Sequence, residues 1–199
     1  MNVYIWNDNP LPYEYSYDFK NKNYSTVVND WWNLRSWTNQ SRILFDSNKW
    51  ISSQSWGWMY YNLGSDKMTN AKKVTITCWL YLESTSQLWV NLYSNTSRWN
   101  PALWSYIYNV GNELNINLWN ETKKEWWMTS SWNLQWTAVY DLINKTAVLN
   151  YTQGSSASIS WTLTDSSIAS IRWWCNYIWF VTWQSWGTGY WTTIYVKIE

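Results

Sequence analysis

The segment Val74–Leu82 places apolar side chains at every second position, with threonine and aromatic residues between them. A period of two is the pattern of a β-strand that turns one face to a core. The pattern recurs in short runs bounded by Asn, Ser, Asp and Gly, such as Leu88–Tyr93 and Tyr177–Val181. About a dozen such runs, with turn residues every 8–12 positions, predict an all-β fold, an antiparallel β-sandwich of the jelly-roll type.

The strand pattern continues to the end of the chain, and no segment predicts a helix. Two hairpins are indicated: Leu103–Tyr108 with Leu114–Leu118, and Thr137–Asp141 with Thr146–Tyr151. The segment Ile168–Ile171 is interpreted as a further strand. Alternation assigns the following residues to the core between two sheets: Val74, Ile76, Cys78, Leu80, Val90, Ile116, Leu118, Val139, Val148 and Ile178.

The length and the linker signals predict one domain. A chain of 199 residues is enough for one sandwich with a full core. Pro10 and Pro12 lie in a polar context, so residues 1–13 are interpreted as a lead-in segment and residues 14–199 as the single jelly-roll domain. The first residues lack a basic start followed by an apolar run, so we expect the chain to be part of a longer or processed protein.

The charge pattern excludes several classes of partner. Lys and Arg total 14 and Asp and Glu total 13, with no basic stripe that would follow phosphates. No run of about 18 apolar residues occurs, so no transmembrane helix is predicted. We therefore expect neither nucleic-acid binding nor membrane insertion, and the sequence does not indicate an oligomeric state. A surface rich in Asn, Ser and Thr favours an extracellular or cell-surface location.

Two residue types limit the chemistry. Histidine is absent, which removes the commonest general base and the commonest metal ligand. The two cysteines, Cys78 and Cys175, are too few for a disulfide scaffold or a zinc knuckle. A single long-range disulfide between them is the alternative, but the apolar alternation around Cys78 predicts a buried free thiol.

Tryptophan is abundant where glycine is scarce. The chain has 23 Trp, 6 Gly and 3 Phe, and its glycine frequency is roughly half the usual value. Many Trp residues stand in turn contexts, and reading Asp30-Trp31 as Asp-Gly would give a strong hairpin-turn dipeptide. We therefore hypothesise that some Trp positions are recoded UGA codons, read as Gly in the organism of origin; the alternative is a genuinely Trp-rich protein. The positions expected to be exposed turn or bulge residues are Trp31, Trp32, Trp126, Trp127, Trp132, Trp173, Trp174 and Trp186.

Four short segments carry a family resemblance: Tyr17–Phe19, Val74–Leu80, Leu134–Asp141 and Lys145–Tyr151. In order and strand pattern they are similar to the concanavalin A-like superfamily, which includes laminin-G-like and legume-lectin-like jelly rolls. In that superfamily an apolar strand often carries a Trp where Trp79 stands. The resemblance covers roughly residues 14 to 199 and implies the jelly-roll fold. Lectins and glucanases both use this fold, so the resemblance leaves the function open.

The acidic residues do not form the pattern of a glycoside hydrolase. Glu14 and Asp18 share a face of one strand but lie about 13 Å apart, whereas retaining hydrolysis needs carboxyl groups about 5 Å apart. Glucanases of the superfamily use a Glu-x-Asp-x-Glu strand, which this chain lacks. We expect no cofactor, with Ca²⁺ as the alternative. Asp141 and Asn144 in the second hairpin, or Asp18, are then the candidate ligands, although such residues also make ordinary turn hydrogen bonds.

Polar and aromatic residues alternate with the apolar ones on the central strands. Tyrosine rings stack on sugar faces and asparagine amides bind hydroxyls, although both also serve as ordinary sheet-surface residues. We expect a non-catalytic carbohydrate-binding or adhesion domain of a bacterial surface or secreted protein, with a glycan or cell-surface polysaccharide as partner. The alternatives are a glycoside hydrolase of the same fold and a structural module of a surface or pilus-like assembly. The candidate carbohydrate-binding residues are Tyr81, Asn91, Tyr93, Tyr106, Tyr108, Asn115 and Asn117.

Overall fold

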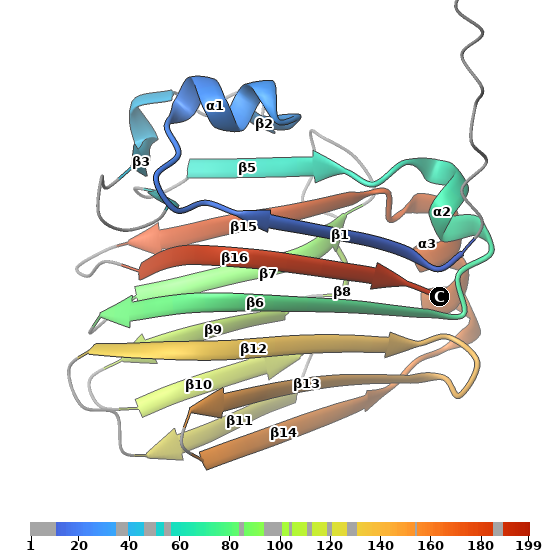
Figure 1. Ribbon diagram of the computed structural model, residues 1–199. Coiled ribbons are helices and arrows are strands. Elements are labelled where there is room, and N and C mark those ends of the chain that lie inside the picture. The colour runs from blue at the N-terminus through green and yellow to red at the C-terminus, as the bar shows by residue number, and fades with distance from the viewer. Residues whose placement is uncertain are drawn as a thin grey trace, which may run out of the picture.

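The fold is known from a computed structural model. It describes residues 11–34, 40–45, 51–53, 57–83, 86–93, 101–103, 105–110, 113–118, 121–126, 131–153, 155–184 and 189–199. Within these ranges the strands form two antiparallel sheets that lie face to face, as Figure 1 shows. The all-β sandwich predicted from the alternation is therefore confirmed.

Sheet A contains the two longest central strands and both ends of the described chain. Its strands follow one another in space as β14 (Ser155–Thr162), β13 (Thr146–Gln153), β12 (Ser131–Asp141), β6 (Lys73–Glu83), β16 (Gly189–Ile198), β4 (Ile51–Ser53) and β3 (Ile43–Phe45), and β1 (Tyr13–Asp18) also pairs with β16. Strand β6 lies between β12 and β16 over nearly its whole length. A strand paired on both sides needs one clean apolar face, which is what its sequence provides.

Sheet B covers the inner face of sheet A. Its order is β11 (Glu121–Trp126), β10 (Glu113–Leu118), β9 (Ser105–Val110), β7 (Ser86–Tyr93), β15 (Tyr177–Gln184), β5 (Gly57–Asn62) and β2 (Trp32–Leu34), and β8 (Pro101–Leu103) pairs with β7. Strands β9 and β10 form the first predicted hairpin, and β12 and β13 in sheet A form the second. Figure 1 shows sheet B behind sheet A, with the short helices at the ends and the upper edge of the sandwich.

The predicted core is correct for the central strands and inverted in one hairpin. Val74, Ile76, Cys78, Leu80 and Ile178 are all buried. Val90, Ile116 and Leu118 lie in described strands, but their side chains are outside the description.

The prediction is wrong for Val139 and Val148, which pair with each other on the outer face and are only half-buried. The inner face of that hairpin carries Ala138, Tyr140, Ala147 and Leu149. The face of Val139 and Val148 also carries Thr137, Asp141 and Thr146, whereas the opposite face is apolar over its whole length, so the opposite face packs in the core.

In the part of the chain that the structure describes, three short α-helices and one 3₁₀ turn connect the strands: α1 (Tyr24–Asn29), α2 (Ser65–Thr69), α3 (Asp165–Trp174) and η1 (Gln40–Arg42). The prediction that the chain forms no helix is therefore wrong, and so is the predicted strand at Ile168–Ile171, which lies inside α3. Among the described helices, none is long and apolar enough to cross a membrane.

Helix α3 has a sequence signal that the strand pattern obscured. The Thr164 hydroxyl accepts the backbone N–H of Ser167 at 3.1 Å, which caps the helix N-terminus. Ile168, Ile171 and Cys175 then recur at helical spacing, and all three are buried. The spacing of three between the two isoleucines fits a helix and not a strand.

Both cysteines are buried free thiols, as predicted for Cys78. Complete burial raises the pKa of the Cys78 thiol well above its usual value, because the thiolate would lose its hydration. The Cys175 thiol donates to the carbonyl of Ser170 at 3.5 Å. Neither thiol has the environment of a reactive nucleophile.

The tryptophans expected to mark turns fall into two groups. Trp31 has φ of 71° and is 78% exposed, and Trp173 on α3 is 67% exposed. Trp32 contradicts the expectation, because it is fully buried. Trp126 ends β11 and Trp132 lies within β12, so neither is a turn residue, and Trp174 lies in α3. The side chains of these three residues, and all of Trp127 and Trp186, lie outside the description.

Candidate functional site

The predicted binding residues do not all lie on one face. Six of them lie in sheet B, at positions of its outer face. The inner face of this sheet is the one that carries the buried Met59 and Ile178. The register pairs Tyr106 with Asn117 and Tyr108 with Asn115, so these positions share one face of the sheet, together with Asn91 and Tyr93. The side chains of these six residues are outside the description. Tyr81 belongs to β6 in sheet A and therefore lies on the opposite side of the sandwich.

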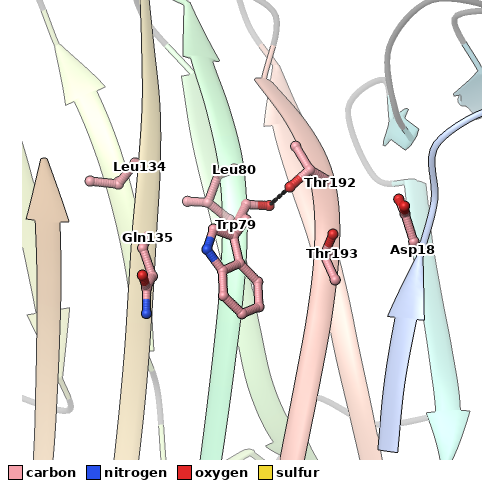
Figure 2. A pocket seen from close by; sticks show the side chains of 7 residues that line it. All are labelled: Asp18, Trp79, Leu80, Leu134, Gln135, Thr192 and Thr193. Atoms are coloured by element: carbon pink, nitrogen blue, oxygen red, sulfur yellow. Dashed lines mark hydrogen bonds between the residues drawn. The ribbon is translucent and has the colours of Figure 1, made fainter.

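A pocket lies over the sheet A face that carries Tyr81. Its volume is about 520 Å³, within the range of small-ligand sites. The lining comes from four neighbouring strands and consists of Asp18, Trp79, Leu80, Leu134, Gln135, Thr192 and Thr193. Figure 2 shows the Trp79 indole lying over the sheet between Gln135 and Thr193. This indole is 39% exposed, unusually high for a large aromatic in the centre of a sheet.

Four of the lining residues form one row across the strands. Gln135 on β12 pairs with Trp79 on β6, Trp79 pairs with Thr193 on β16, and Thr193 pairs with Asp18 on β1. Directly paired residues point to the same face of a sheet. The row Asp18–Thr193–Trp79–Gln135 therefore presents a carboxylate, a hydroxyl, an indole and an amide side by side, as Figure 2 shows.

A bulge in β16 fixes the middle of this row. Trp191 pairs with Leu80 and Thr193 pairs with Trp79, so Thr192 is an extra residue in the strand. Its hydroxyl donates to the carbonyl of Trp79 at 2.7 Å, and its own carbonyl accepts the N–H of Phe19 at 2.9 Å. Thr192 is buried, with 7% exposure. It therefore connects the backbone beneath the indole to the strand end that carries Asp18.

Two tyrosines extend the aromatic surface beside the row. Tyr81 stands two residues after Trp79 on β6, and Tyr190 on β16 pairs with it. Their rings lie 6.3 Å apart between centroids and are tilted by 44°. On the other side of the row, the hydroxyls of Thr77 and Thr137 are 3.1 Å apart. Trp79 thus lies on this face between the Tyr81–Tyr190 pair and the Thr137–Thr77 pair, which Tyr195 continues on β16.

The pocket is almost free of charge. Asp18 is the single charged side chain in the lining, and its Oδ1 accepts the backbone N–H of Lys20 at 2.8 Å. Glu14 lies on the same face of β1, four residues before Asp18. Hydrolysis of a glycosidic bond by the usual route requires two carboxyl groups flanking the bond, and the lining supplies one.

The hairpin predicted as a Ca²⁺ site has the contacts of an ordinary turn. Asp141 Oδ1 accepts the backbone N–H groups of Ile143 and Asn144, and its Oδ2 accepts the side-chain amide of Asn144. These donors lower the pKa of Asp141, the backbone N–H of Asn144 contributing most. Both oxygens are thus engaged by N–H groups, so the donor set does not fit Ca²⁺. Among the described residues no group of three or more acidic, histidine or cysteine side chains gathers as a metal site.

The sequence indicated some of these residues and missed others. Tyr81 was selected by alternation, Trp79 by its position in the superfamily pattern, and Asp18 as an acidic residue near the chain start. Gln135 and Thr193 carried no signal of their own, because only the pairing of distant strands brings them beside Trp79.

Comparison with known proteins identifies the fold. No protein-family model matches the chain, and no curated protein matches its sequence. Among solved structures, the CBM2 module of the evolved Dit protein of Lactobacillus casei BL23 phage J-1 superposes with a TM-score of 0.65 at 8% identity, covering 94% of this chain and 97% of that one.

Two further structures show the same arrangement. The lectin UEA-II complexed with galactose gives a TM-score of 0.61 at 9% identity, covering 94% and 98%. A conserved carbohydrate esterase from the Shiga toxin-encoding bacteriophage phi24B gives 0.60 at 10% identity, covering 92% and 97%. The chain therefore has the concanavalin A-like jelly-roll fold.

Proposed function

We propose that this chain is a non-catalytic carbohydrate-binding domain that holds glycans on the outer face of sheet A. The observation that carries the proposal is the row Asp18–Thr193–Trp79–Gln135 across four strands. An exposed indole offers a flat apolar platform for the C–H face of a sugar ring. The carboxylate and amide beside it offer acceptors and donors for hydroxyl groups.

The structural neighbours support the same function. A phage carbohydrate-binding module, a galactose-bound lectin and a carbohydrate esterase share the fold. Sequence identities of 8–10% show only that the fold is shared. The proposal therefore depends on the residues of the site and not on the functions of these neighbours. Because the pocket lining has one carboxylate, binding without cleavage fits it better than hydrolysis.

The test compares two exposed tryptophans. Trp79→Ala removes the platform, and Trp173→Ala removes a more exposed indole from α3, which is not part of the pocket lining. We expect a glycan array to give hits with the unaltered protein. Trp79→Ala should lower the affinity for a hit about tenfold or more, while Trp173→Ala leaves it unchanged. Equal binding by Trp79→Ala and the unaltered protein would place the glycan site elsewhere.

The biological setting is also a proposal. We propose that the domain belongs to a bacterial surface or secreted protein, outside the cell, where its partner is a cell-surface polysaccharide. Its support is the uncharged polar composition, with 14% charged residues. Fractionation of the source cells, with an antibody to this chain, tests the location. Recovery in the cytosolic fraction alone would contradict it.

We further propose that part of the tryptophan is recoded glycine. Trp31 occupies the position after the C-cap Asp30 of α1, its N–H bonds to the carbonyl of Val28, and its φ is 71°. Helices commonly end there with a glycine, because a Cβ strains the left-handed conformation. Trp136 is buried, and its indole N–H has no acceptor among the described residues, unlike an ordinary buried Trp.

Other tryptophans fit their surroundings as Trp. The indole N–H of Trp32 donates to the Tyr15 hydroxyl at 3.1 Å, as in an ordinary buried Trp, and the proposed glycan platform requires an indole at Trp79. We therefore expect UGA codons at Trp31 and Trp136 and UGG codons at Trp32 and Trp79. The nucleotide sequence of the gene, with peptide mass spectrometry of the natural protein, decides each position. UGG at Trp31 and Trp136 would end the hypothesis.

A further inference from the structure

We infer that the pocket takes a linear, uncharged glycan that lies across strands β12, β6, β16 and β1, and not a single terminal sugar. This inference rests on the proposed function. Its starting point is the length of the row. Adjacent strands are about 4.8 Å apart, so Asp18 and Gln135, three strand steps from each other, span about 14 Å. One sugar ring stacked on Trp79 reaches a neighbouring strand but not both ends of that row.

The flanking rows give the ligand its direction. On one side of the Asp18–Gln135 row stand Tyr81 and Tyr190, whose rings are 6.3 Å apart. On the other side stands the hydroxyl pair of Thr77 and Thr137. A chain that runs across the strands meets all four residues of the row within the pocket, whereas one that runs along β6 leaves the pocket lining when it reaches Tyr81.

The charge of the lining selects the class of glycan. Asp18 is the only charged group among the lining residues, and no basic side chain belongs to them. A uronic-acid chain would bring carboxylates toward Asp18 without a cation to offset the repulsion. A neutral chain instead gives Asp18 hydroxyl donors, and charge-assisted hydrogen bonds of this kind are the stronger ones.

The position of Asp18 is fixed before any ligand binds. Its Oδ1 accepts the N–H of Lys20, and the adjacent Phe19 N–H is held by the carbonyl of the bulge residue Thr192. The same Thr192 holds the backbone of Trp79 through its hydroxyl. The end and the centre of the row therefore share one rigid connection, which lowers the cost of ordering the site on binding.

The experiment is a ladder of chain lengths. The probes are soluble oligomers of one to six units of β-1,4-linked glucose, β-1,4-linked N-acetylglucosamine and α-1,4-linked glucose, with an oligogalacturonate ladder as the anionic comparison. Affinity is measured by calorimetry or NMR titration. For at least one neutral series, we expect the affinity to rise about tenfold or more between one and four units. The oligogalacturonates should bind more weakly than any neutral series that binds.

Variants at the two ends of the row locate the contacts. Asp18→Asn and Gln135→Ala should each weaken tetramer binding about three- to tenfold and leave the single sugar unchanged. Glu14→Gln, on the same face of β1 but outside the lining, is the matched control and should alter neither. Thermal melts show that each variant is folded.

The outcomes separate this inference from the proposed function. Equal affinity for one and four units, with binding still lost in Trp79→Ala, would overturn the linear ligand and leave carbohydrate binding intact. Tight binding of oligogalacturonate would overturn the uncharged class. Absence of binding to every probe would overturn both the inference and the proposed function.

Discussion

Trp32 donates its indole N–H to the hydroxyl of Tyr15 at 3.1 Å, and this bond connects sheet B to sheet A. Tyr15 lies on β1 and Trp32 on β2, at the edge where the sandwich would otherwise be open. Tyr61 of β5 stacks on Tyr15 with centroids 4.1 Å apart, and Phe19 meets Trp32 edge-on at 5.2 Å. Aromatic side chains thus close this edge of the core.

The first prediction concerns that closure. Tyr15→Phe keeps the ring and its stacking but leaves the buried indole N–H of Trp32 without this acceptor. Loss of one partner of a buried hydrogen bond costs about 1–3 kcal/mol. We expect the free energy of unfolding, measured with urea, to fall by that amount. Tyr177→Phe is the control, since it keeps the ring that meets Tyr60 edge-on within sheet B. A change below about 0.3 kcal/mol in Tyr15→Phe would show that the bond contributes little.

The second prediction compares two exposed tryptophans on different backbones. Trp31→Gly removes a Cβ from a left-handed residue and should stabilise the fold by about 1 kcal/mol. Trp173→Gly places glycine inside helix α3 and should destabilise it by about 0.5 kcal/mol. Urea unfolding of both variants measures the change in the free energy of unfolding, which should be positive for Trp31→Gly and negative for Trp173→Gly. Destabilisation by Trp31→Gly would mean that the Trp31 side chain makes contacts that outweigh its strain.

The third prediction concerns the bulge. Thr192→Val is close in size but lacks the hydroxyl that donates to the carbonyl of Trp79. We expect a loss of about 1–2 kcal/mol in stability and weaker glycan binding, because the platform backbone is no longer held. Thr192→Ser keeps the hydroxyl and should retain glycan affinity. If Thr192→Val binds as tightly as Thr192→Ser, the bulge does not position Trp79.

The sequence predicted the central strand of sheet A correctly, but it did not predict which residues gather around the pocket. Strand β6 has one apolar face, so its alternation had a single solution. Val139 and Val148 suggested the wrong face of their hairpin, because that face also carries Thr137, Asp141 and Thr146 and the continuous apolar face is the opposite one. Helix α3 was hidden because isoleucine is common in strands, although the spacing of three between Ile168 and Ile171 is helical. Gln135 and Thr193 meet Trp79 through long-range register, which depends on the whole sheet and not on any local pattern.

The fourth prediction concerns the thiols. Both cysteines are buried, and burial raises the pKa of Cys78. We expect the native protein to show no rapid reaction with Ellman's reagent, and the protein in guanidinium chloride to release colour from both thiols, since the chain has 2 Cys. Rapid labelling of a thiol in the native state would show that the core opens near it.

The fifth prediction concerns acid. Asp30 Oδ2 accepts the Tyr17 hydroxyl at 2.7 Å and the Lys22 ammonium at 3.2 Å. These contacts, the Tyr17 hydrogen bond first, lower the pKa of Asp30 below 3.8 in the folded state. A lowered folded pKa stabilises the fold above the unfolded pKa, and this contribution disappears as the pH falls through the folded pKa.

Comparison with Asp30→Asn isolates the effect. The difference in Tm between the unaltered protein and the variant should be constant from about pH 5 to 7 and should shrink below about pH 4. Asp141 also has a lowered pKa, but it is present in both proteins and its contribution cancels in the difference. A difference that grows on acidification would contradict the assigned sign.

The extra residue in β16 also sets how the end of this chain must be aligned. Tyr190 and Thr193 share the outer face although three positions separate them, while Trp191 and Ile194 are both buried. If Thr192 were kept but the bulge were lost, a regular strand would exchange inside and outside for every later residue, sending Ile194, Val196 and Ile198 to solvent and Lys197 to the core. Deletion of Thr192 would instead leave these residues on their present faces. A homologue with a regular strand here therefore needs a one-residue gap, and an ungapped comparison would match core residues with surface residues from Thr193 to the last strand residue, Ile198.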